Sequence, residues 1–99
     1  MNMSKTLMRD TVIKREVKEA DGALYRYSLI MSESNKVASY KIPLYSIEIE
    51  MTDEDGNKTH ARTRELFADV GKALSFFKKL ADNLATPLNL PYIIEDEMR

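Results

Sequence analysis

The sequence has no cysteine, one histidine, three glycines and three prolines in 99 residues. Without cysteine the chain cannot form disulfides, thiolate zinc sites, iron–sulfur clusters or a cysteine nucleophile, and it has no need of an oxidising compartment. We therefore expect a cytoplasmic protein. The single histidine, His60, excludes metal sites that need two imidazoles, and we interpret it as a surface residue. Three glycines are too few for a glycine-rich phosphate loop.

The sequence also lacks a charge imbalance and a long apolar run. Its 15 basic and 16 acidic residues give a formal net charge of -1, so the strong positive field typical of non-specific nucleic-acid or membrane binding is absent. No uncharged apolar stretch approaches the roughly 18 residues needed to cross a bilayer. We expect no membrane partner, and a single domain, because a chain of this length can bury one core.

Two Asp-Gly pairs, Asp21-Gly22 and Asp55-Gly56, lie between segments rich in β-branched and aromatic residues. Tight hairpin turns need positive φ angles, which glycine and aspartate tolerate, so both pairs predict β-hairpins. The first hairpin would join a strand over Thr11–Glu19 to one over Leu24–Met31. In the second of these strands, apolar and polar residues alternate cleanly. In the first they alternate poorly, which suits a strand at the edge of the sheet. We expect residues 1–10 to be flexible.

An apolar segment over Val37–Met51 is long for one strand, and its alternation changes phase at Pro43. Because proline cannot donate a hydrogen bond to a neighbouring strand, we expect a bulge or a break into two strands there. The second part, Tyr45–Met51, has the strongest strand pattern in the protein. A polar return strand follows over Lys58–Glu65.

From Asp69 onward, apolar residues recur at the spacing of an α-helix. Apolar residues at this spacing are Val70, Ala73, Leu74, Phe77, Leu80, Ala81 and Leu84. The stripe predicts an amphipathic helix over residues 69–84, with Asp69 as its N-cap. Thr86 precedes Pro87, which disfavours further helix, and a short second helix is predicted over residues 90–98.

Strands that precede helices are typical of an α+β domain. We predict an antiparallel meander of about four strands within residues 11–66. The helix over residues 69–84 would pack on one face of this sheet, followed by the short C-terminal helix. The opposite face of the sheet would be exposed to water.

No motif implies a cofactor or a metal. Residues 53–57 superficially resemble part of a calcium loop, but alignment of Gly56 with the invariant EF-hand glycine puts Arg62 where the bidentate glutamate belongs. The acidic run Glu95–Glu97 lies near no predicted apolar cavity that would shift a carboxyl pKa. Because no nucleophile, base and cavity converge, we expect a protein that is not an enzyme.

Apolar residues that exceed the needs of the core carry the main functional prediction. Phe76 points away from the main helical stripe, and Leu88, Leu90 and Tyr92 flank the two helices. We favour burial of these side chains by a C-terminal helix that folds back. Otherwise they form an exposed patch for an unknown protein partner or for self-association. Our first hypothesis is a non-catalytic protein-interaction or regulatory module.

Two other functions are compatible with the residues. Single-stranded nucleic acid would stack on Tyr25 and Tyr27, with Arg26 beside them, although both tyrosines are in phase with core residues of the same strand. Nucleic acid is therefore the less favoured partner. Small-molecule binding between sheet and helix would rest on Tyr40 and Tyr45 near Pro43, and we rank it last.

The strand Tyr45-Ser46-Ile47-Glu48-Ile49, the turn Asp55-Gly56, the following helix and the tail over residues 86–96 carry a resemblance. From Tyr45 to Asp96 the sequence resembles a small, uncharacterised domain family of clostridial and related Firmicutes bacteria, one of the families of unknown function. The resemblance implies a bacterial source. It implies no catalytic residue, ligand or partner.

Overall fold

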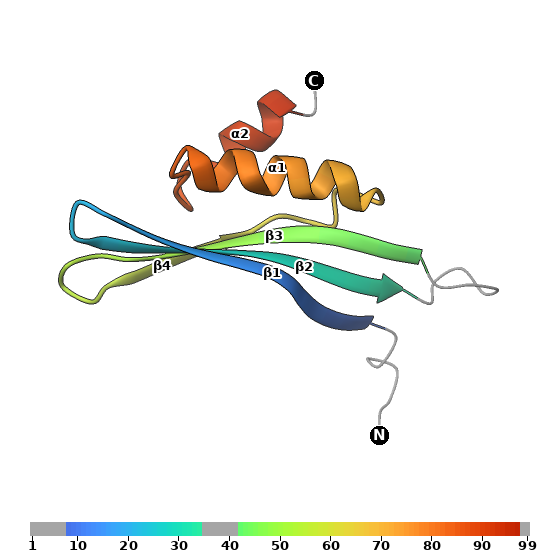
Figure 1. Ribbon diagram of the computed structural model, residues 1–99, viewed down its shortest axis with the longest axis horizontal. Helices are drawn as coiled ribbons and strands as arrows, with labels where there is room; N and C mark the ends of the chain where they lie inside the picture. The colour runs from blue at the N-terminus through green and yellow to red at the C-terminus, as the bar shows by residue number, and fades with distance from the viewer. Residues whose placement is uncertain (1–7, 35–41, 98–99) are drawn as a thin grey trace.

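The computed structural model describes residues 8–34 and 42–97, and it confirms the α+β class. The elements are β1 (Met8–Ala20), β2 (Ala23–Ser34), β3 (Ile42–Thr52), β4 (Lys58–Arg62), α1 (Val70–Asp82) and α2 (Leu90–Glu97). The strands form one antiparallel sheet in the order β1-β2-β3-β4. Helix α1 lies across one face of this sheet (Figure 1). The predicted meander with one covering helix is therefore correct.

Both Asp-Gly pairs form hairpin turns as predicted. Asp21 and Gly22 have φ angles of 53° and 81°, so they form a two-residue turn of the kind that matches the twist of the flanking strands. The β3–β4 turn is longer, and Gly56 supplies its positive φ of 85°. One carboxylate oxygen of Asp53 accepts hydrogen bonds from the backbone N–H groups of Asp55 and Asn57, each at 2.9 Å. These bonds, the one from Asn57 above all, lower the pKa of Asp53.

Pro43 lies near the start of β3 and does not interrupt it. The pairing of β3 with β2 runs without a register shift from Ile42 opposite Ser34 to Thr52 opposite Leu24. The predicted bulge or break at Pro43 is therefore wrong. Strand β4 pairs with β3 only from Glu48 onward, so Pro43 lies where β3 has one neighbouring strand and a missing N–H is tolerated. The earlier part of the expected strand lies outside the described residues.

The core lies between the sheet and α1. The fully buried sheet residues Tyr27, Leu29, Ile47 and Ile49 come from one face of β2 and β3. The helix contributes Ala73, Phe76, Phe77, Leu80 and Ala81. Each large aliphatic or phenylalanine side chain removed from water in this interface stabilises the fold by about 1.5–3 kcal/mol.

The buried stripe of α1 is rotated relative to the stripe predicted from the sequence. Phe76, which we placed off the stripe, is 3% exposed, whereas Leu74 and Val70, which we placed on it, are 38% and 42% exposed. The ring of Phe67 in the β4–α1 segment packs against Phe76 with centroids 5.5 Å apart. Phe67 lies outside the helical pattern of apolar residues. Its contact with Phe76 determines which side of the apolar stripe of α1 is buried.

The two ends of α1 have well-defined caps. Asp69 is the N-cap as predicted, and its carboxylate accepts from the N–H groups of Gly71 and Lys72. At the C-terminal end the N–H of Leu84 donates to Ala81 O and the N–H of Ala85 donates to Leu80 O, which is the Schellman arrangement. Leu84 has a φ of 52°, a left-handed conformation that costs a non-glycine residue about 1 kcal/mol.

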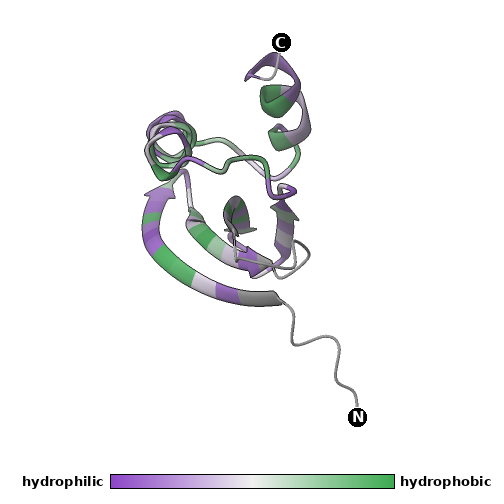
Figure 2. Ribbon diagram, turned by 90° about the vertical axis from the view of Figure 1, so that its right-hand side faces the viewer, coloured by the Kyte–Doolittle hydropathy of each residue, from purple (hydrophilic) through white to green (hydrophobic). Residues whose placement is uncertain are grey.

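Helix α2 is held by few side chains. It lies on the same side of the sheet as α1 but projects farther from it (Figures 1 and 2). Leu90 is its fully buried anchor, while Ile93 and Ile94 are partly buried against the core. No helix within residues 8–34 and 42–97 has the length and apolar character of a membrane span.

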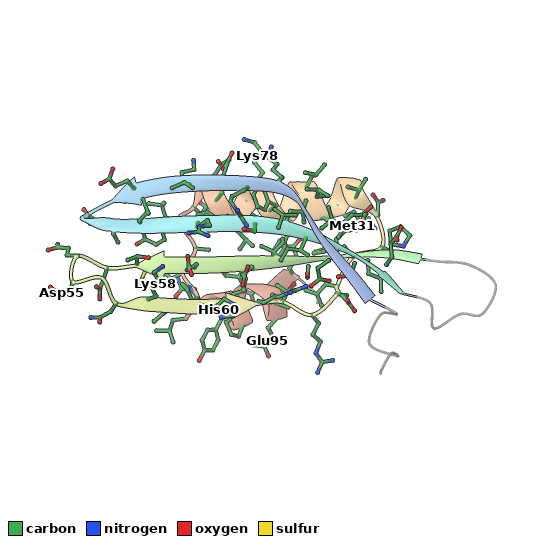
Figure 3. The ribbon with its side chains drawn as sticks, turned by 90° about the horizontal axis from the view of Figure 1, so that it is seen from below. Met31, Asp55, Lys58, His60, Lys78 and Glu95 are labelled. Carbon is green, nitrogen blue, oxygen red and sulfur yellow. The ribbon has the colours of Figure 1, made fainter. Side chains whose placement is uncertain are left out.

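The sheet has a bulge in β1, between Val12 and Lys14, which the sequence did not predict. Bulges bend a strand and increase its twist. Before the bulge, β1 turns across the sheet face opposite α1 (Figure 3). As a result Asp10 of β1 forms an ion pair with Arg62 of β4 at 3.2 Å, although these strands are the two edges of the sheet.

The region beneath this part of β1 is buried, although we expected the whole face to be wet. Ser28, Ser32 and Ser46 are at most 2% exposed. Ser32 donates to Asp10 at 2.7 Å, and the guanidinium groups of Arg15 and Arg62 donate to Ser28 and Ser46. The Ser32 hydroxyl is the main cause of a lowered pKa at Asp10, with Arg62 contributing further. Small polar residues therefore let the sheet curl onto itself.

The observed orientation of α1 predicts that two alanine substitutions, at Phe76 and at Leu74, lower the free energy of unfolding by different amounts. Phe76→Ala should lower the free energy of unfolding by about 3 kcal/mol, because it leaves a cavity beside Phe67. Leu74→Ala should lower it by less than about 1 kcal/mol, since the side chain is already partly in water. Urea unfolding followed by circular dichroism measures both. Equal losses would contradict the observed orientation of α1.

Candidate functional site

The most exposed large apolar side chains in the described residues lie in the turn just before α2 and in its first turn. Leu88 is 80% exposed and Tyr92 is 69% exposed. Thr86 sets their position, because its hydroxyl accepts from the N–H of Asn89 at 3.1 Å and its carbonyl accepts from the N–H of Leu90. Thr86 therefore caps the helical turn, with Pro87 in the first helical position that proline favours.

The outer face of α2 combines apolar and acidic residues. Leu88, Tyr92 and Glu95 follow at intervals of four and three, so they lie along one side of a helical turn, and Asp96 lies next to them. Leu90, Ile93 and Ile94 form the inner side. Glu97 is paired with Lys79 of α1 at 3.0 Å. We call Leu88, Tyr92, Glu95 and Asp96 the α2 outer surface.

A pocket of about 470 Å³ adjoins Leu88. Its walls come from the β3–β4 hairpin and from the α1–α2 linker. The lining residues are Met51, Thr59, His60, Thr86, Pro87 and Leu88. Leu88 is the residue that this pocket shares with the α2 outer surface. The pocket therefore adjoins the α2 outer surface at Leu88.

The hairpin residues of this pocket were not predicted as site residues. His60 is exposed as we expected, and its Nε2 lies 2.6 Å from a carboxylate oxygen of Glu48. Met51 and Thr59 carry no sequence signal that links them to Leu88, because the contact depends on the path of the linker over β3 and β4. Within the described residues no group of three or more His, Cys, Asp or Glu side chains gathers to hold a metal ion.

The four residues predicted for a partner surface divide into two pairs. Leu88 and Tyr92 are exposed, whereas Phe76 and Leu90 are 3% and 1% exposed and belong to the core. The burial that we favoured is therefore correct for Phe76 and Leu90, and the alternative of an exposed patch applies only to Leu88 and Tyr92. Leu90 points inward because it lies two residues from both Leu88 and Tyr92, on the opposite side of the helix.

The tyrosines of β2 do not form an exposed stacking surface. Tyr27 is fully buried, and its ring lies parallel to that of Tyr25 at a centroid distance of 6.4 Å. Arg26 points to the opposite face of the sheet, where it pairs with Glu50 at 3.3 Å. A base needs an exposed ring face on which to stack, and Tyr27 offers none. Tyr27 belongs to the hydrophobic core instead.

The third predicted region also belongs largely to the core. Tyr45 is 7% exposed, and its backbone pairs with Phe67. Tyr40 lies outside the described residues. Because β3 passes Pro43 without a bulge, the irregularity that we expected to open a binding site is absent from the described part of β3.

Comparison with known proteins places these features in a small α+β domain of unknown function. The chain belongs to the family described as "Family of unknown function (DUF6514)", whose sequence profile matches residues 8–99. The match includes the full length of every strand and helix described above. No curated protein and no solved structure matches the chain.

Tyr27 provides a test of how the sheet is joined to the end of α1. Its hydroxyl donates to Ala85 O at 2.8 Å, and burial raises its pKa from 10.0 to about 12. The neutral side chain therefore stabilises the fold fully below pH 10, and this contribution is lost as the pH rises toward 12. At pH 7, Tyr27→Phe should cost about 1–2 kcal/mol, because Ala85 O loses its partner.

Above pH 10 the stability difference between the natural protein and Tyr27→Phe should narrow, since only the natural protein has this tyrosine to ionise. Urea unfolding at a series of pH values between 7 and 11 measures the difference. A difference that stays constant across this range would show that Tyr27 is not buried in its neutral form.

Proposed function

We propose that this protein is a non-catalytic protein-interaction module that binds its partner through the α2 outer surface and the adjoining pocket. The observation that carries the proposal is the exposure of Leu88 and Tyr92, 80% and 69% respectively. Large apolar side chains that lie together on a surface are typical of binding sites, and tyrosine is enriched among residues that dominate binding energy.

The chemistry of the surface suggests a partner of complementary character. The pocket beside Leu88 would accept an apolar side chain. Glu95 and Asp96 follow Tyr92 on the same helix face and would attract basic residues that flank this side chain. The partner is thus a protein segment with an apolar anchor and neighbouring lysines or arginines. A bacterial and cytoplasmic setting is part of the proposal, and the lack of cysteine supports the second of these.

A substitution that adds charge to the apolar centre tests the proposal. Leu88→Glu should weaken partner binding at least about tenfold, because it places a carboxylate in the desolvated contact. The fold should be unchanged, since the side chain is already in water. The measurement is affinity capture from a lysate of the native host, followed by calorimetric titration of the purified partner.

Val70→Glu is the matched control. It places the same charge on an exposed apolar position in the first turn of α1, where a carboxylate suits the helix dipole. A partner of the α2 outer surface binds this variant normally and loses affinity for Leu88→Glu. If both variants capture the same proteins with the affinity of the natural chain, the α2 outer surface is not the binding site.

A further inference from the structure

Strand β1 forms a free edge of the sheet. Within the described residues it pairs with β2 alone, and Figure 3 shows it along one long side of the molecule. The half before the bulge bends across the sheet, whereas residues 14–20 continue straight to the Asp21-Gly22 turn. The second half is therefore the part that another strand can approach. Val17, near its centre, is 55% exposed.

The hairpin fixes which backbone groups point to this edge. A two-residue turn closes on a hydrogen-bonded pair, here Ala20 with Ala23, and such pairs alternate along an antiparallel ladder. Lys18 and Glu16 thus bond to β2. Arg15, Val17 and Glu19 direct their N–H and C=O groups outward, away from β2.

We propose that β1 joins two copies of this chain, antiparallel and with Val17 on the two-fold axis, into one continuous sheet of eight strands, four from each copy. The sequence Arg15-Glu16-Val17-Lys18-Glu19 is complementary to itself in this register. Arg15 faces Glu19 of the second copy, Glu16 faces Lys18, and Val17 faces Val17. Opposite charges in such pairs stabilise a sheet, and like charges destabilise it.

Neighbouring registers lack this complementarity. Centring the axis on Glu16 places Glu16 opposite itself and Lys14 opposite Lys18. Centring it on Lys18 places two lysines together, and centring it on Arg15 places two arginines together and extends the pairing to the bulge. The charge pattern therefore selects one register, and antiparallel self-pairing about a two-fold axis makes the interface closed rather than fibrous.

Glu16 gives a second, independent observation. Its Oε1 atom is buried and has no hydrogen-bond partner in the described residues, which is costly for a carboxylate oxygen. Lys18 lies 3.9 Å from Asp82, a loose contact that leaves its ammonium able to turn. In the dimer, Lys18 of the second copy stands opposite Glu16 on the same face of the sheet, where its ammonium group is able to pair with this carboxylate group.

Charged residues on an edge strand usually prevent pairing with other strands. In β1 they do so for most partners, because a strand of different charge order would place like charges opposite one another. The same charges favour one partner, the antiparallel copy. This edge therefore selects a second copy of the chain, independently of the protein partner proposed for the α2 outer surface.

Two charge reversals and their mixture test the dimer. Sedimentation velocity of the full chain from about 5 to 500 µM should show a reversible dimer. Arg15→Glu and Glu19→Arg should each raise the dimer dissociation constant at least about tenfold, because each creates two pairs of like charges. An equimolar mixture of the two variants should recover the dimer, since each charge then faces its opposite. Circular dichroism confirms that both variants are folded.

Two controls separate this interface from the rest of the molecule. Lys58→Glu reverses a charge on β4, the opposite edge, and Leu88→Glu changes the α2 outer surface. Both should leave the dimer unchanged, so failure here is distinct from failure of the proposed function. The proposal is overturned if the natural chain stays monomeric over the whole range, if either single reversal dimerises normally, or if the mixture stays monomeric.

Discussion

The hydroxyl of Tyr27 donates to the carbonyl of Ala85 at 2.8 Å inside the core, and the arrangement of the C-terminal third follows from this bond. It fixes the residue that ends the Schellman turn of α1, so the helix cannot slide along the sheet without losing a buried hydrogen bond. The linker then leaves Ala85 over the β3–β4 hairpin. Thr86 starts the next helical turn there, and Leu88 is left in water. A contact in the core thus determines what is exposed on the surface.

The two faces of the sheet are stabilised by different chemistry. The face under α1 is apolar and gains its stability from burial of aromatic and aliphatic side chains. The opposite face is held by serines and by charged side chains that join β1 to β4. The bulge between Val12 and Lys14 divides β1 into two halves with different contacts. Its first half closes the curled sheet, and its second half pairs with β2 alone within the described residues.

The local elements of the fold were predictable from the sequence, because local chemistry specifies them. Asp-Gly pairs require positive φ, Asp69 caps a helix, and the helical period marks α1; each was found in place. The rotation of α1 was not predictable, since the helical spacing assigns Leu74 to the stripe and leaves Phe76 outside it, and the contact of Phe76 with Phe67 is not visible in that spacing. The bulge in β1 was missed for a related reason. It reflects the curl of the whole sheet and the Asp10–Arg62 pair, which joins residues 52 positions apart.

The candidate site was predictable only in part. Leu88 and Tyr92 were identified as surplus apolar residues, and the helical spacing separates them from Leu90 once the start of α2 is known. The pocket beside them combines the β3–β4 hairpin with the linker, and no local pattern relates those segments. The prediction at Pro43 was wrong because the cost of a proline in a strand depends on how many strands flank β3 at that point.

The meander has a consequence for synthesis on the ribosome. Each strand pairs with its neighbour in sequence, so loop closure is inexpensive and the sheet is able to assemble as the chain emerges. Its apolar face, however, remains uncovered until α1 has been made and Ala85 has reached Tyr27, 58 residues earlier in the chain. A chain that is truncated or stalled before this point presents the aromatic surface of β2 and β3 to the cell, where it is prone to aggregation or to capture by chaperones.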